Sequence, residues 1–199
     1  GPVIHEGDVQ KLIAKLELLQ AGDVLVLAGS IPGSVPDDIY RRIMSEMSGR
    51  GIEVVVDATK ELLVNVLEYH PFLIKPNHHE LGGIFGVELK TREDVIPYAR
   101  RMQQMGARNV LVSMAAAGAV LVAEDKSVYE TDAPKGILVN GVGAGDSMVA
   151  GFLAGWMEKK EYRHAFAMGV SAGSASAFSE RLAEKKEIMD LYRREFTRS

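Results

Sequence analysis

The sequence predicts an α/β fold with a doubly wound, mostly parallel sheet and helices on both faces, in which residues 1–199 form a single domain. Short apolar runs alternate with longer amphipathic ones, which is the order expected of parallel strands joined by helices. The composition, 47% hydrophobic and 25% charged, is that of an ordinary globular protein. No internal repeat, low-complexity tract or linker-like change of composition divides the chain.

Short apolar runs bounded by turn residues are expected to form the strands. The run at residues 109–114 is the clearest central strand. It is followed by a predicted hairpin over residues 118–134, in which Glu124–Ser127 form the turn. The other predicted strands cover residues 23–29, 52–58 and 71–77.

Longer segments with apolar residues at helical spacing are expected to form the helices. Residues 34–47 are the first of these, with Pro36 in the first turn and an inner face of Ile39, Ile43, Met44 and Met47. The chain after residue 145 is predicted to be mostly helical. Its helices are expected over residues 146–158, 162–178 and 183–196.

A further helix is predicted to begin near residue 91. Thr91 and Asp94 have the spacing of a capping box, in which each side chain bonds to the other residue's backbone amide. The inner face of this helix is expected to consist of Val95, Ile96, Ala99 and Met102.

Charge and composition exclude several classes of function. A formal net charge of -4 provides no basic field for a polyphosphate backbone, so a nucleic-acid partner is disfavoured. No apolar run approaches membrane-spanning length, and the N-terminus lacks the layout of a signal peptide. The absence of cysteine excludes disulfides and thiolate metal sites, and it is consistent with the cytoplasm as the expected location.

The turn Gly143-Ala144-Gly145, followed at once by Asp146, is the main candidate for a functional site. Glycines before a helix let the backbone adopt positive φ and let a phosphate approach the unpaired amides of the helix N-terminus. A carboxylate beside such an anion cradle fits a reaction in which a hydroxyl loses its proton while a phosphoryl group is transferred to it. The alternative is a tight turn in which Asp146 only caps the helix.

Two other glycine motifs do not fit this segment. No Lys-[Ser/Thr] pair follows the glycines, so the turn is not a Walker A loop. The GxGxxG spacing of dinucleotide-binding folds is out of register, and it belongs in the first βα unit of a domain. An NAD-linked oxidoreductase is therefore the weaker alternative.

Polar segments follow two other predicted strands. Asn77 and Glu80 have the spacing of a capping box. Lys75 is expected to be solvated, as lysines at strand ends usually are, with a phosphate contact as the alternative. Ser113–Gly118 leaves the carboxyl end of the central strand, where open α/β sheets bind ligands.

Four segments carry a resemblance to known proteins: LAGSIPGSVP (residues 27–36), KPNHHELGGIFG (75–86), VSMAAAGAVLV (112–122) and VGAGDSMVAGF (142–152). In this order they resemble the PfkB (ribokinase-like) family of sugar kinases, and the resemblance covers nearly the whole chain. It implies the ribokinase-like fold and a kinase that uses ATP and Mg²⁺. Within the family it is greatest to kinases of fructose 1-phosphate, and next to those of tagatose 6-phosphate.

The resemblance also implies roles for individual residues. It makes Asp146 the catalytic base that contacts the sugar, and the turn Gly143–Gly145 the anion hole. Asn77 and Glu80 would organise Mg²⁺ and the phosphates, largely through water. Part of the sugar-phosphate site would lie at Gly29 and Ser30, whose alternative role is a simple turn before Pro36.

The nucleotide is expected to contact the loop after the central strand, together with Gly145 and Asp146. In the family this loop has an early glycine, whereas this sequence has alanines. The loop consists of Ser113, Met114, Ala115, Ala116, Ala117 and Gly118. By the same resemblance, the small residues of Ser171–Ala177 border the adenine pocket, although close helix packing also explains them.

Relative to the family pattern, the first strands and the β-sheet lid are missing from this chain. The sequence is therefore interpreted as the C-terminal nucleotide-binding and catalytic part of a kinase, whose full-length form is expected to be a homodimer. The alternative is a nucleotide-binding module that does not turn over substrate on its own.

Overall fold

The computed structural model describes residues 3–58 and 60–197. Its strands form one six-stranded sheet in the order β1-β2-β3-β4-β5-β6. The chain divides into two compact units, of which unit 1 comprises residues 1–89 and 97–111 and unit 2 comprises residues 90–96 and 112–199. The predicted α/β fold, with a mostly parallel sheet flanked by helices, is confirmed. The prediction of a single domain stays a prediction.

Unit 1 contains the parallel part of the sheet. β1 pairs with β2 from Val24↔Glu53 to Ala28↔Asp57, β2 with β3, and the start of β4 with β3. All these strands therefore end at the same edge of the sheet. The elements are α1 (Glu6–Leu16), β1 (Val24–Ala28), α2 (Ile39–Met47), β2 (Glu53–Asp57), α3 (Lys60–Val64), the 3₁₀ turn η1 (Leu67–Tyr69), β3 (Leu73–Ile74), α4 (His78–Phe85), most of α5 (Arg92–Gln104) and the start of β4 (Asn109–Ser113).

The inner face predicted for α2 is confirmed, because Ile39, Ile43, Met44 and Met47 are all buried. The predicted start is wrong: α2 begins at Ile39, and Pro36 lies before it in a turn closed by the bond from Ile39 N to Pro36 O. The predicted bounds of β3 are also too long, since the strand covers only two residues. Proline has no N–H for the ladder, so pairing cannot continue through Pro76.

The helix α1 was not predicted from the sequence. The last turn of this helix is held by Arg50, whose guanidinium donates hydrogen bonds to the carbonyl oxygens of Leu16, Glu17 and Leu19 at 3.2, 3.0 and 2.8 Å. The guanidinium thus supplies a charged donor to carbonyls at the end of α1 and just beyond it, of which that of Leu16 also accepts from Leu19 N. The helix end therefore depends on a residue more than thirty positions away.

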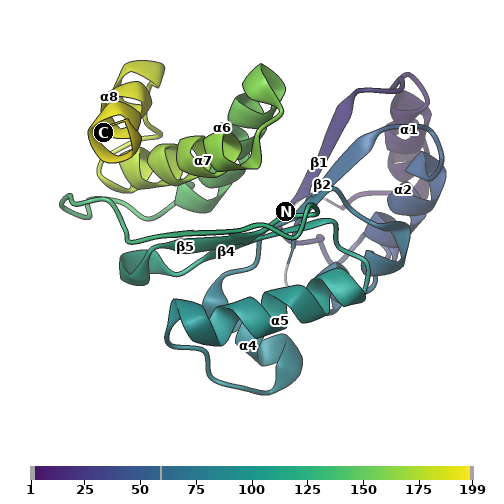
Figure 1. Ribbon diagram of the computed structural model, residues 1–199. Helices are drawn as coiled ribbons and strands as arrows, with labels where there is room; N and C mark the ends of the chain where they lie inside the picture. Colours follow the sequence, from purple (N-terminus) through teal and green to yellow (C-terminus); the bar gives the residue numbers. More distant parts are fainter. Residues whose placement is uncertain (1–2, 59, 198–199) are drawn as a thin grey trace. The chain divides into compact units, whose positions relative to one another are not determined.

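Unit 2 contains the hairpin β5 (Ala119–Val122)–β6 (Val128–Thr131), which confirms the predicted hairpin, and the helices that follow it. The helices are α6 (Ala144–Lys159), α7 (Tyr162–Ala177) and α8 (Lys185–Phe196), close to their predicted bounds (Figure 1). A Cβ on Gly151 would lie 2.5 Å from the Cβ of Ala172, and one on Gly173 would lie 3.0 Å from the oxygen of Ala144. The packing of α6 against α7 thus accounts for the small residues of Ser171–Ala177.

The capping box predicted for α5 is present. Thr91 N donates to the Asp94 carboxylate at 2.9 Å, and Asp94 N donates to Thr91 Oγ1 at 3.2 Å. The bonds from the Thr91 and Lys90 backbones lower the pKa of Asp94. Of the predicted inner face, Val95, Ala99 and Met102 are buried, whereas Ile96 is half-buried. Within residues 3–58 and 60–197, no helix is both long and apolar enough to cross a membrane.

Candidate active site

The glycine turn in unit 2 leads directly into α6, as the sequence predicts. Gly143 is the N-cap and has φ 77°, a left-handed conformation that favours glycine. A Cβ at this position would also lie 2.6 Å from Cδ2 of Leu182. Both the backbone conformation and the available space therefore favour glycine at the start of this helix.

The first amides of α6 remain available to a ligand. Ala144 N donates to Gly141 O at 3.3 Å, and Ser147 N makes the first helical bond, to Gly143 O at 2.9 Å. Among the described residues, no hydrogen-bond acceptor is found for the amides of Gly145 and Asp146. Together with the positive end of the helix dipole, these N–H groups form a site suited to an anion.

Asp146 occupies the third position of α6 and is exposed. In the described part of the chain its carboxylate accepts no hydrogen bond, and the N-cap position belongs to Gly143. The carboxylate therefore does not cap the helix, contrary to the alternative role considered for it. It is accessible to a hydroxyl that approaches the helix N-terminus.

Hydrogen bonds from Asn140 and Ser176 hold the turn in place. Asn140 Oδ1 accepts from Val142 N at 3.0 Å, and its Nδ2 donates to Glu180 O at 3.3 Å. Ser176 Oγ donates to Ser147 Oγ at 2.8 Å, which ties the end of α7 to the start of α6. The roles of these two side chains in holding the turn were not predicted, because the bonds from Asn140 to Glu180 and from Ser176 to Ser147 join residues 40 and 29 positions apart in the sequence.

The predicted nucleotide loop, Ser113–Gly118, also lies in unit 2. It follows the end of β4 and forms a tight turn, in which Met114 N donates to Gly118 O at 2.8 Å. Met114 is buried, whereas Ala115, Ala116 and Ala117 are exposed. A nucleotide could thus contact the three alanines, but not the buried side chain of Met114.

Ala115 has φ 48°, in the left-handed region. This conformation costs a residue with a Cβ about 1–2 kcal/mol. We expect Ala115→Gly to raise the free energy of unfolding by up to about 1 kcal/mol, since glycine relieves the strain but loses more chain entropy on folding. Urea denaturation measures the change. The control Ala116→Gly changes a position without positive φ, and it is expected to lower the free energy of unfolding instead. Equal destabilisation by both variants would contradict the prediction.

The capping box of Asn77 and Glu80 is present in unit 1, at the start of α4. Asn77 N donates to Glu80 Oε2, and Glu80 N donates to Asn77 Oδ1, both at 2.8 Å. Both side chains are half-buried. Among the described residues, no group of three or more His, Asp and Glu side chains could hold a metal ion by itself. Mg²⁺ usually keeps several waters and takes few protein ligands, so the two oxygens of a single Asn–Glu pair suit this ion.

Gly29 and Ser30 follow the carboxyl end of β1 in the same unit. Gly29 has φ 91°, its N–H donates to Asp57 O at 3.1 Å, and its carbonyl oxygen accepts from the hydroxyl of Tyr40 at 3.2 Å. Ser30 is exposed. The loop is therefore fixed to β2 and to α2 at Gly29, and it presents Ser30 to solvent.

The expectation that Lys75 is solvated is wrong. Its side chain is only 8% exposed, and Nζ lies 3.3 Å from Oδ1 of Asp57. Asp57 is the last residue of β2, and Lys75 follows β3, so parallel pairing brings the two side chains to the same edge of the sheet. This long-range contact supplies the partner that a buried ammonium requires.

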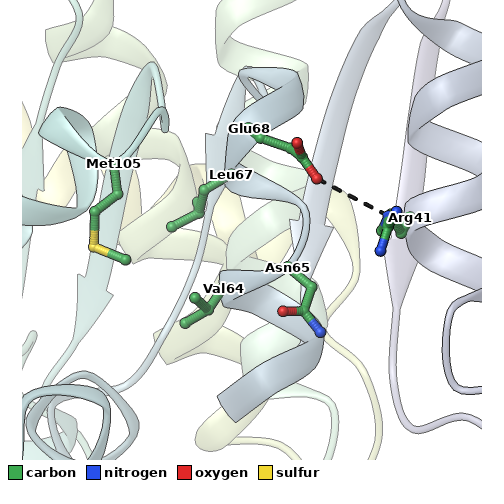
Figure 2. Close-up of a pocket in the computed structure, with 6 residues that line it drawn as sticks. All are labelled: Arg41, Val64, Asn65, Leu67, Glu68 and Met105. Atoms are coloured by element: carbon green, nitrogen blue, oxygen red, sulfur yellow. Dashed lines mark ion pairs between the residues drawn. The ribbon is translucent and has the colours of Figure 1, made fainter.

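A cavity of about 460 Å³ lies elsewhere in unit 1 (Figure 2). It is lined by Arg41, Val64, Asn65, Leu67, Glu68 and Met105. None of the predicted site residues lines it, and its arginine lies 4.0 Å from the Glu68 carboxylate. The cavity therefore provides neither a glycine turn nor an unpaired cation for a phosphate, and we do not assign the site to it.

Comparison with known proteins identifies a family to which most of the chain is similar. The model of a family described as pfkB family carbohydrate kinase matches residues 1–188. The 1-phosphofructokinase of Bacillus subtilis (strain 168) is 45% identical over 191 residues, which cover 96% of this chain and 63% of the relative. A D-tagatose-1-phosphate kinase of Bacillus licheniformis is 34% identical, over 94% of this chain and 62% of its own length.

A solved structure has the same fold. Phosphofructokinase-2 from Escherichia coli, in complex with fructose-6-phosphate, matches with a TM-score of 0.90 and 28% sequence identity. The match covers 100% of this chain and 64% of that one. The chain thus spans less than two thirds of the length of each of these three proteins.

Proposed function

The chain belongs to the PfkB family of carbohydrate kinases, and on that premise we propose that its protein transfers the terminal phosphoryl group of ATP to a hydroxyl of a sugar phosphate. The proposed acceptor is fructose 1-phosphate and the product fructose 1,6-bisphosphate. The observation that carries the proposal is the exposed carboxylate of Asp146 beside the unpaired amides at the start of α6. If Asp146 only capped the helix, its carboxylate would accept a hydrogen bond from the first amides, and neither group would be free.

In the proposed reaction, Asp146 accepts the proton of the sugar's 6-hydroxyl. The hydroxyl oxygen forms a bond to the γ-phosphorus of ATP while the bond from that phosphorus to the β–γ bridging oxygen breaks, and ADP leaves with the electron pair. The turn Gly143–Gly145 and the amides of Gly145 and Asp146 stabilise the negative charge on the transferred group. The nucleotide lies against Ala115–Ala117.

Asn77 and Glu80 would hold Mg²⁺, and the donors that they offer fit this ion. Amide and carboxylate oxygens are the hard ligands that Mg²⁺ prefers. One oxygen of Glu80 is used in the capping box, which leaves Oε1 for a cation or its waters. When bound, Mg²⁺ would neutralise charge on the phosphates of ATP.

The names of the relatives support a ketohexose 1-phosphate as the acceptor. Those described above are a 1-phosphofructokinase and a D-tagatose-1-phosphate kinase. Fructose and tagatose differ only at carbon 4, and both 1-phosphates offer a free 6-hydroxyl. Tagatose 1-phosphate is therefore the second candidate, ahead of the tagatose 6-phosphate predicted from the sequence. Gly29 and Ser30 are proposed to contact the sugar phosphate.

The experiment is an ADP-release assay on the full-length protein with Mg²⁺ and ATP. Fructose 1-phosphate, tagatose 1-phosphate, tagatose 6-phosphate and fructose 6-phosphate are compared side by side. We expect the highest kcat/KM with fructose 1-phosphate. ADP formation with none of the four would contradict the proposal, and retained binding of Mg·ATP in that case would indicate a nucleotide-binding module.

A further inference from the structure

Lys75 and Asp57 form a buried ion pair that the proposed reaction does not use. The two side chains are 8% and 18% exposed. For comparison, the pair of Lys11 with Asp8 in α1 has a similar distance, 3.1 Å, but its side chains are 78% and 50% exposed. Removing an ammonium and a carboxylate from water is costly, so such a pair is maintained only where its geometry is fixed by the surrounding structure.

The ion pair continues the contact between β2 and β3 beyond the end of the shorter strand. β3 has two residues, and Lys75 N makes the next backbone bond, to Val56 O at 3.3 Å. Pro76 then removes an N–H and restricts φ, and Asn77 is the N-cap of α4. Since only one residue separates Lys75 from Asn77, anchoring Lys75 to Asp57 constrains where the capping box of Asn77 and Glu80 lies.

Asp57 is also linked to the loop after β1. Its carbonyl oxygen accepts from Gly29 N at 3.1 Å, and the carbonyl of Gly29 accepts from Tyr40. Burial raises the pKa of the Tyr40 hydroxyl, and the negative charge of Asp57 raises it further. The ends of β1, β2 and β3 thus share one polar network, in which Lys75 supplies the positive charge.

We propose that Lys75 is a positioning residue for magnesium–nucleotide binding. Through its ion pair with Asp57 it holds the turn Lys75-Pro76-Asn77, and so keeps the oxygens of Asn77 and Glu80 in the place where they meet the hydrated cation. Lys75 itself contacts neither the cation nor the sugar. This inference rests on the proposed function, because Asn77 and Glu80 take their role from it.

The test is binding of Mg²⁺ in the presence of ADP, measured by calorimetry on the full-length protein. Residues that orient metal-binding groups typically change metal affinity 10- to 100-fold when mutated. We therefore expect Lys75→Met to weaken the apparent Mg²⁺ affinity by about 10-fold or more. Lys75→Arg keeps the positive charge, so its apparent Mg²⁺ affinity is expected to be closer to that of the wild type. Binding of fructose 1-phosphate without nucleotide is expected to be unchanged.

Two further variants complete the design. Lys11→Met removes the lysine of the exposed pair and is expected to leave Mg²⁺ affinity unchanged. If Lys75→Met alone does not fold, because the Asp57 carboxylate loses its ion pair with the ammonium, the double variant Lys75→Met/Asp57→Asn removes both charges and is expected to show the same loss of Mg²⁺ affinity. A folded variant with the Mg²⁺ affinity of the wild type would overturn the inference. An equal loss of Mg²⁺ and sugar affinity would also overturn it, since that result indicates general loosening of unit 1.

Failure of the proposed function gives a different result, because this assay requires no turnover. If Mg²⁺ binding with ADP depends on Lys75 while no sugar phosphate supports ADP formation, the positioning role stands and the kinase assignment is wrong. If ADP forms with fructose 1-phosphate while Lys75→Met binds Mg²⁺ normally, the kinase function stands and the positioning role of Lys75 is wrong.

Discussion

Replacing Asp146 with asparagine is expected to lower kcat about 1,000-fold, because a positioned general base typically contributes 10²- to 10⁴-fold to such a rate. Asparagine retains the size of the side chain but cannot accept the proton of the sugar hydroxyl. The amides at the start of α6 remain, so the affinity for Mg·ATP is expected to stay within a few-fold of the wild type. Steady-state ADP release and calorimetry of nucleotide binding measure the two quantities.

Asp8 provides a matched control for this variant. It occupies the third position of α1, after a glycine, just as Asp146 follows Gly145 in α6. Asp8→Asn is expected to leave kcat unchanged, and its effect is limited to the stability of α1, since Asp8 completes the capping box there. A kcat within twofold of the wild type for Asp146→Asn would show that Asp146 is not the base.

Gly118→Ala is expected to destabilise the protein by roughly 2–6 kcal/mol. A Cβ on Gly118 would lie 1.9 Å from the carbonyl oxygen of Thr131, at the end of β6, and the backbone has φ 92° and ψ -134°. Overpacking costs about 1–3 kcal/mol and an unfavourable backbone conformation a similar amount. For a chain of this length each kcal/mol lowers Tm by about 2–4 °C, so thermal unfolding followed by circular dichroism provides the measurement.

Gly83 serves as the control position for this substitution. It lies within α4, and a Cβ there would meet no atom within 4 Å. Gly83→Ala is expected to stabilise the protein by about 1 kcal/mol, because alanine is the better helix former. If Gly118→Ala unfolds at the temperature of the wild type, the β4–β5 turn is not packed as described.

The features that the sequence predicted well are those set by local pattern. The spacing of Ile39, Ile43, Met44 and Met47 identified the buried face of α2, and the spacing of Thr91 and Asp94 identified a capping box. The glycines before Asp146 likewise predicted a helix whose N-cap residue has a left-handed backbone conformation. In each case the residues involved are close in sequence, and they form one turn or one face of a single element.

The features that the sequence did not reveal depend on partners distant in the chain. Burial of Lys75 follows from parallel pairing of β2 with β3, which brings Asp57 next to it. The end of α1 depends on Arg50, and the need for glycine at position 118 arises from Thr131. Propensity and periodicity do not encode such contacts. The position of Lys75 at the end of a predicted strand was nevertheless a usable signal of a contact with the end of a neighbouring strand.

The most direct test of the central claim is a crystal structure of the full-length protein with Mg²⁺, a non-hydrolysable ATP analogue and fructose 1-phosphate. We predict that a carboxylate oxygen of Asp146 lies within hydrogen-bond reach, about 2.6–3.2 Å, of the sugar's 6-hydroxyl oxygen. The terminal phosphate is expected to face the amides of Gly145 and Asp146. A sugar bound with all its hydroxyls beyond the reach of Asp146 would contradict the assignment of this residue as the base.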